Sequence, residues 1–131
     1  MLISLVLAAP AFAHHSTAPF DMSKAVTVTG TVTKFVWENP HSYIYMDVQD
    51  EPGTIQRWRM EIDAVNALVR YGWTRDSLKS GDRISCIGAR AKDLSEFEQK
   101  CFTVQFPDGR KLVATPFGEP PEPAAPPHSG R

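Results

Sequence analysis

The sequence predicts a mainly β protein, a small five-stranded barrel in which one short helix separates the third strand from the fourth. Three observations predict this class. Apolar and polar residues alternate in several runs from Val26 onward, as they do in half-buried strands. Turn-forming Pro and Gly residues lie between these runs. Only residues 63–72 combine helical spacing with start and stop signals.

The first strand is predicted to serve two sides of the barrel. Its β-branched alternation starts at Val26 and changes phase after Lys34, so that Phe35 and Trp37 take the other side. A glycine in mid-strand, Gly30, followed by this change of phase predicts a bulge or a strong bend. A strand bent in this way can pair on both sides of a small barrel.

The next two strands are predicted to form a hairpin around Asp50-Glu51-Pro52-Gly53. Matching their apolar faces leaves two registers, which set His41 opposite either Glu61 or Asp63. In both registers a carboxylate lies near His41 on the outer face. The apolar face carries Ile44, Met46, Val48, Trp58, Met60 and Ile62. The outer face carries Tyr43, Tyr45, Arg57 and Arg59.

The helix is expected to span about two turns, with Asp63 as its N-cap and Gly72 as its stop. The remaining elements are a strand at 83–89, a polar loop at 90–100, a strand at 101–106 and a short last segment at 111–114. Three strands, a helix and two strands form the order of the OB-fold, a Greek-key barrel that binds ligands on strands two and three. Another small barrel or sandwich is the alternative.

Both ends of the chain are predicted to lie outside the barrel domain at 26–115. Residues 1–13 read as a signal peptide, because an apolar run ends in Ala-Phe-Ala. A membrane span needs about 18 apolar residues, and neither this run nor any later one is long enough. Residues 14–25 are expected to form an extended arm, and the Pro-rich residues 116–131 a disordered tail. We therefore expect a periplasmic or secreted protein.

Charge and cysteine content narrow the class of function. A formal net charge of -1 at pH 7 argues against a nucleic-acid binder, which is normally basic. In an exported protein, Cys86 and Cys101 are expected to form a disulfide, with two buried thiols as the alternative. The cysteines are too far apart for a C-x-x-C redox pair, and the sequence has no serine elbow or phosphate loop. A binding domain is favoured over an enzyme.

The first candidate site is metal-binding and starts at His14, which becomes the N-terminus if the leader is removed. Its α-amine and imidazole would chelate one ion, as in histidine-brace copper proteins; nitrogen ligands favour Cu(II), with Zn(II) as the alternative. His15 and His41 are the further candidate ligands, and Glu61 or Asp63 would orient the His41 ring. A copper oxygenase is the one enzyme that suits such a site. Alternatively, the histidine pair is solvated and His41 only completes a turn.

The second candidate site is the outer face with Tyr43, Tyr45, Arg57 and Arg59. Aromatic rings beside arginines on an OB barrel are typical of surfaces that hold oligosaccharides or single strands. An envelope glycan or protein is the expected partner, since export and charge argue against nucleic acid. In the alternative interpretation, these cross-strand pairs only stabilise the sheet and cover its outer side.

The chain also resembles a family of small exported bacterial proteins classed as a domain of unknown function. The resemblance covers nearly the whole domain and implies export and a barrel-like fold; it assigns no activity. The cysteine pair is not part of the family pattern. The matching segments are Ala13-His14-His15-Ser16, Phe20-Asp21, Val28-Thr29-Gly30-Thr31-Val32-Thr33-Lys34, Trp37-Glu38-Asn39-Pro40-His41, Asp47-Val48, Trp58 with Glu61, Arg70-Tyr71-Gly72-Trp73 and Leu78-Lys79-Ser80-Gly81-Asp82.

Overall fold

Strand β1 (Val26–Val36) pairs with a different neighbour at each of its ends. In the computed structural model, which describes residues 17–116, its first half pairs with β4 (Arg83–Arg90) and its second half with β2 (Ser42–Glu51). The register with β2 shifts at a bulge just before Lys34. The predicted irregularity is confirmed, and one strand serves both sides of the barrel.

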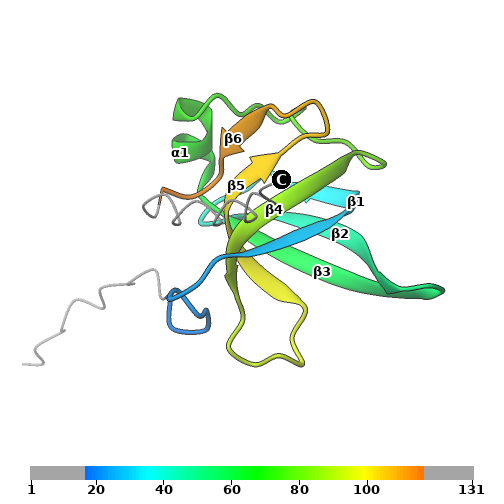
Figure 1. Ribbon diagram of the computed structural model, residues 1–131. Helices are drawn as coiled ribbons and strands as arrows, with labels where there is room; N and C mark the ends of the chain where they lie inside the picture. The colour runs from blue at the N-terminus through cyan, green and yellow to red at the C-terminus, as the bar shows by residue number, and fades with distance from the viewer. Residues whose placement is uncertain (1–16, 117–131) are drawn as a thin grey trace, which may run out of the picture.

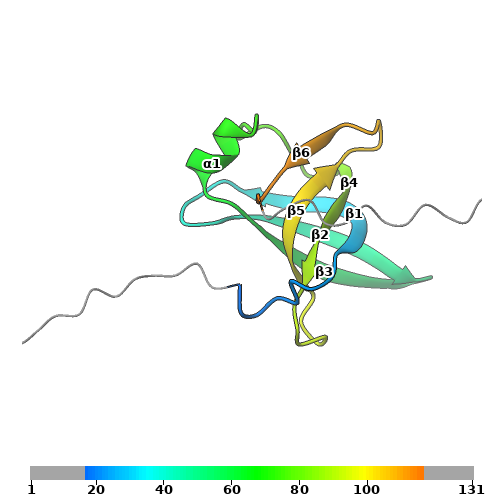
Figure 2. The ribbon, with the colours of Figure 1, turned by 60° about the vertical axis from the view of Figure 1, so that its left-hand side comes forward.

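The barrel closes between strands that are far apart in the sequence (Figures 1 and 2). Strand β3 (Thr54–Ile62) pairs with β2 in the predicted hairpin, and β5 (Glu98–Gln105) pairs antiparallel with β4 and parallel with β3. These contacts close a five-stranded mixed barrel, so the OB-like fold is confirmed. The predicted short last segment contains a sixth strand, β6 (Lys111–Val113), which pairs with β5 outside the ring.

Strand β5 begins at Glu98, whereas the sequence predicts a loop up to residue 100. The residues at its start, Glu98, Gln99 and Lys100, are all polar and show no apolar alternation. They form a strand because they pair in parallel with residues 59–61 of β3. The predicted loop therefore extended too far, to residue 100, because residues 98–100 become strand only when the barrel closes against β3.

The barrel interior holds the apolar faces that the alternation predicts. Its fully buried side chains include Val32, Ile44, Met46, Met60, Ile62, Leu68, Trp73, Ile84 and Val104. Helix α1 (Val65–Arg70) lies at one end of the barrel and buries Ala67 and Leu68 (Figure 1). Gly72 follows it with a φ of 92°, as expected of a glycine that ends a helix.

The start of α1 differs from the prediction. Ala64 is the N-cap residue, and it makes no side-chain cap. Asp63 still belongs to the sheet edge, where its backbone N–H and C=O both bond to other backbone groups. The N–H of Val65 donates instead to Oδ1 of Asn39, 3.0 Å away in the loop before β2. The expected Asp63 cap was therefore wrong, because the tertiary structure supplies the acceptor from another loop.

The described part of the predicted arm packs onto the barrel. Phe20 is 3% exposed and joins Ala89 and Phe102 in a second, smaller apolar cluster. It also pairs with Ala91 in an isolated antiparallel bridge. The arm is thus anchored before β1 begins.

Several predictions fall outside the described residues. Residues 1–16, with the predicted signal peptide, His14 and His15, lie there, as do residues 117–131 of the predicted tail. Within residues 17–116, no helix is both long and apolar enough to cross a membrane.

Cys86 and Cys101 are fully buried free thiols, so the predicted disulfide is absent from the structure. Cys86 lies opposite Val104 on β5, whereas Cys101 lies opposite Gly88 on β4, and the two cysteines are therefore offset along the paired strands. The Cys86 thiol lies 3.8 Å from the Met46 sulfur. Burial, reinforced by a hydrogen bond with Cys86, raises the pKa of the Cys101 thiol well above its ordinary value. The alternative of two buried thiols is the observed one.

Candidate functional site

The structure brings the four residues of the predicted ligand face together on the outer side of β2 and β3. Tyr45 lies opposite Arg59, and Asp47 lies opposite Arg57, while Tyr43 lies opposite Glu61. The residues between them on each strand point into the barrel. We call this surface, comprising Tyr43, Tyr45, Arg57 and Arg59, the β2–β3 face.

An open pocket of about 430 Å³ lies on the β2–β3 face. It is lined by Thr33, Tyr45, Asp47, Arg57, Trp58 and Arg59, among others. Arg57 is exposed, and among the described residues no carboxylate lies within ion-pair distance of its guanidinium. Its donors therefore remain directed to solvent or to a ligand.

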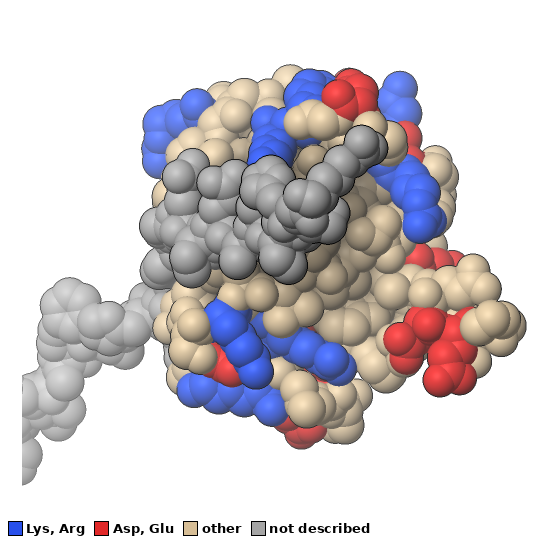
Figure 3. Space-filling model, in the orientation of Figure 1, with Lys and Arg blue, Asp and Glu red and all other residues tan. Residues whose placement is uncertain are grey.

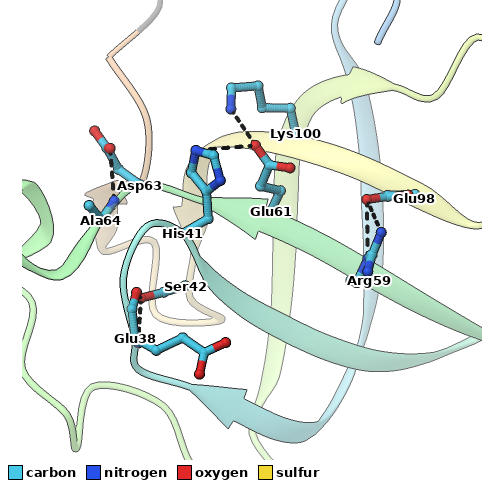
Figure 4. Close-up of polar contacts among 9 residues, drawn as sticks. All are labelled: Glu38, His41, Ser42, Arg59, Glu61, Asp63, Ala64, Glu98 and Lys100. Carbon is cyan, nitrogen blue, oxygen red and sulfur yellow. Dashed lines mark hydrogen bonds and ion pairs between the residues drawn. The ribbon is translucent and has the colours of Figure 1, made fainter. Parts of the chain in front are cut away.

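Arg59, by contrast, is held in place. Its Nε and Nη2 atoms donate to Oε1 of Glu98 at 3.1 and 2.6 Å (Figure 4). Its guanidinium carbon lies 5.3 Å from the centre of the Tyr43 ring, within the range of a cation–π contact. The pocket thus combines one fixed guanidinium with one that has no carboxylate partner.

At the other end of the face, His41 approaches Glu61. The observed register places Asp63, not Glu61, directly across from His41, since Ser42 pairs with Ile62. Even so, His41 Nε2 lies 3.7 Å from Glu61 Oε1, while the Asp63 carboxylate accepts a hydrogen bond from the next backbone N–H (Figure 4). Of the two predicted carboxylate partners, Glu61 is therefore the one near the imidazole.

The loop that carries His41 is fixed by Ser42, the first residue of β2. The Ser42 hydroxyl donates to the Glu38 carbonyl at 3.0 Å and accepts from the Glu38 N–H at 3.1 Å (Figure 4). Ser42 is buried, so these bonds close the loop against the barrel. His41 is held directly beside this closure.

Lys100, which was not among the predicted site residues, forms a cluster with His41 and Glu61. Its Nζ lies 2.7 Å from the same Glu61 oxygen that faces His41, and its side chain is only 5% exposed (Figure 4). The Lys100 ammonium also lies 6.0 Å from the Phe20 ring of the anchored arm.

The Glu61 carboxylate also acts on Tyr43, which lies opposite it on β2. Burial of the phenol, followed by the negative charge of Glu61, raises the pKa of Tyr43.

A charge pattern in the sequence could have revealed the cluster. Arg59 and Glu61 are two residues apart, as are Glu98 and Lys100, with the opposite order of charge. Paired in parallel, the two segments bring each charge beside its opposite. The pattern gains this meaning only once β3 and β5 are known to be neighbours.

The predicted metal ligands are divided between described and undescribed parts of the chain. Within residues 17–116, no three His, Cys, Asp or Glu side chains lie close enough together to hold a metal ion. His41 lies within that range, beside Glu61, whereas His14 and His15 lie outside it. The described cluster can thus contribute one imidazole with a neighbouring carboxylate.

Comparison with known proteins gives a family and no activity. Residues 2–98 match the model of a protein family described as "Family of unknown function (DUF6152)". No curated protein matches the chain. The matched range contains β1 to β4 and α1, with His41 and Glu61, and ends at the first residue of β5.

Proposed function

The chain belongs to this family of unknown function, and we propose that it is an exported binding domain that holds an envelope oligosaccharide on the β2–β3 face. The open pocket beside Tyr45, Arg57 and Arg59 carries the proposal. The apolar run at residues 1–13, with its Ala-Phe-Ala end, supports export.

The chemistry of the pocket suits a sugar. The half-buried Tyr45 ring offers an apolar surface to the C–H face of a pyranose, while Arg57 and Asp47 offer a donor and an acceptor to its hydroxyl groups. Glu98 and Tyr43 already fix the Arg59 guanidinium, so less side-chain entropy is lost on binding. An envelope protein segment is the alternative occupant of the same face.

The first prediction is that removal of the ring or the guanidinium weakens binding. Tyr45→Ala and Arg57→Ala are each expected to weaken the affinity for a bound glycan about tenfold, as truncation of a central contact does. A glycan array identifies the oligosaccharide, and isothermal titration calorimetry measures the affinities. Arg75→Ala removes an exposed guanidinium outside the pocket and is expected to change nothing. Equal losses in all three variants would contradict the proposal; capture of an envelope protein in place of any glycan would select the alternative occupant.

Copper binding at the N-terminus is the second candidate, favoured by the His41–Glu61 contact at 3.7 Å. A carboxylate beside an imidazole is the usual arrangement that orients a histidine ligand. Phe20 anchors the arm next to Lys100, which contacts the same carboxylate. The six residues from Phe20 back to His14 can span roughly 20 Å when extended, a length that would allow His14 to share one ion with His41.

The second prediction concerns the processed protein with His14 at its N-terminus. It is expected to bind one Cu(II), and both His14→Ala and His41→Ala are expected to weaken the affinity at least about tenfold, since each removes a nitrogen ligand. Mass spectrometry establishes the N-terminus, and titration followed by electron paramagnetic resonance counts the nitrogen ligands. His128→Ala is the control. A mature chain that starts at another residue, or unchanged affinity in His14→Ala, would exclude this site.

A further inference from the structure

A second pocket lies between the segment that precedes β1 and the loop that joins β4 to β5. It has a volume of about 410 Å³ and is lined by Asp21, Lys24, Arg90, Lys92 and Leu94, among others. Figure 3 shows several Lys and Arg side chains at the lower end of the molecule, with Asp and Glu side chains among them. The volume is within the range of small-molecule sites, about 300–1,000 Å³. None of these residues belongs to the β2–β3 face.

The pocket carries an excess of positive charge. Lys24, Arg90 and Lys92 line it, against the single carboxylate of Asp21. That carboxylate already accepts hydrogen bonds from the backbone N–H and the hydroxyl of Ser23, and it lies 3.8 Å from the Lys24 ammonium. The Asp21 carboxylate is therefore already paired with Ser23 and Lys24 of the same turn.

Three further carboxylates lie on the β4–β5 loop or at its end: Asp93, Glu96 and Glu98. Asp93, the neighbour of Lys92, accepts hydrogen bonds from the N–H and the hydroxyl of Ser95. Glu98 accepts from Arg59 on the neighbouring strand β3, and among the described residues Glu96 makes no ion pair with Lys24, Arg90 or Lys92. The cations that line the pocket are thus not paired with these groups.

Arg90 is the fixed element of the pocket. Its guanidinium carbon lies 5.0 Å from the centre of the Trp58 ring, and its Nη2 donates to the Leu94 carbonyl at 3.0 Å. Among residues 17–116, its buried Nε has no hydrogen-bond partner. Because these contacts already orient the Arg90 guanidinium, binding a ligand costs little further side-chain entropy, and the guanidinium still has N–H donors to offer.

We propose that this pocket binds the phosphate group of a phosphorylated ligand. Three cations and one carboxylate leave an excess of two positive charges, which a phosphate monoester, with a charge of about −1.5 to −2 at pH 7, offsets better than a carboxylate. A planar guanidinium flanked by ammonium groups is the usual donor set for phosphate oxygens. The remaining volume admits the organic part of the ligand. A phosphorylated sugar and a phospholipid headgroup share this chemistry.

The test uses the folded chain and three probes: inorganic phosphate, glucose 1-phosphate and vesicles that contain phosphatidylglycerol. Amide NMR signals at residues 21–24 and 90–92 are expected to shift with at least one of them at constant ionic strength, and to stay unchanged with glucose. Response to glucose 1-phosphate assigns the site to a soluble phosphate ester, whereas response to the vesicles alone assigns it to a lipid headgroup. If no probe shifts these signals, the proposal is wrong.

Charge variants give the matching control. Lys92→Ala is expected to weaken the binding of the responding probe about fivefold, and Arg90→Lys, which keeps the charge but loses the planar fork, by a similar factor. Asp21→Asn is expected to tighten binding, because it removes the one carboxylate that lines the pocket. Lys111→Ala, on β6, removes an exposed ammonium elsewhere and is expected to change nothing. Equal weakening by Lys92→Ala and Lys111→Ala would mean that the probe responds only to net charge, which would overturn the proposal.

Discussion

Gly88→Ala is expected to lower the free energy of unfolding by about 3 kcal/mol or more, a large part of the stability of a domain of this size. A Cβ at this position would lie 2.0 Å from the Lys100 carbonyl oxygen and 2.9 Å from the Cys101 Cα. Both are backbone atoms of β5, so one of the strands must move. Gly88 lies at the irregularity in the β4–β5 pairing, where the two backbones approach closely.

Gly109→Ala is the matched control for this prediction. Gly109 has a φ of 89°, and a Cβ there would meet no atom within 4 Å. The substitution therefore adds only the strain of a left-handed residue, about 1–2 kcal/mol. Urea unfolding followed by circular dichroism measures both variants. If Gly88→Ala costs no more than Gly109→Ala, the close approach of the backbones is not what requires glycine at position 88.

Glu61→Ala is expected to destabilise the domain by about 3 kcal/mol, because it removes the carboxylate that a buried ammonium contacts. The Lys100 side chain is 5% exposed, and its Nζ lies 2.7 Å from Glu61 Oε1. Glu98→Ala removes the partner of Arg59, whose side chain is 46% exposed. Solvent screens that pair, and its loss is expected to cost about 1 kcal/mol or less.

A double variant separates the charge from the packing. Replacing a buried ion pair by apolar side chains is often neutral, so Glu61→Ala combined with Lys100→Met is expected to recover most of the loss. Urea unfolding of Glu61→Ala, Lys100→Met and the double variant completes the thermodynamic cycle. If the double variant is as unstable as Glu61→Ala, the ammonium does not cause the loss. If Glu61→Ala and Glu98→Ala lower the free energy of unfolding equally, burial of the ion pair does not determine how much its loss costs.

Most of the barrel could be predicted because its signals are local. Alternation assigned the apolar face of each strand, and the phase change after Lys34 located the bulge. The apolar faces of the hairpin reduced its register to two possibilities and brought Tyr45, Arg57 and Arg59 onto one surface. A strand orients alternate residues to opposite sides whatever its partners are, so these features follow from the order of residues alone.

The errors share a different cause. Asp63 has the residue type of an N-cap, yet Asn39 from another loop bonds to the first turn of α1. Cys86 and Cys101 are an even pair, yet both are buried free thiols inside the barrel, where Cys86 lies opposite Val104 and Cys101 opposite Gly88. In each case a partner distant in the sequence decides the outcome, and no pattern near the residue reports that partner.

The sequence by itself determined the class of fold, the sides of the strands and the surface that carries the aromatic and basic residues. Only the tertiary structure decided which charges meet there. Closure of β5 against β3 brings Lys100 to Glu61 and Glu98 to Arg59, and it leaves Arg57 without a carboxylate partner among the described residues. An ion pair depends on atoms within a few ångströms, whereas alternation depends only on neighbours along one strand, so only the closed barrel could reveal the pairs.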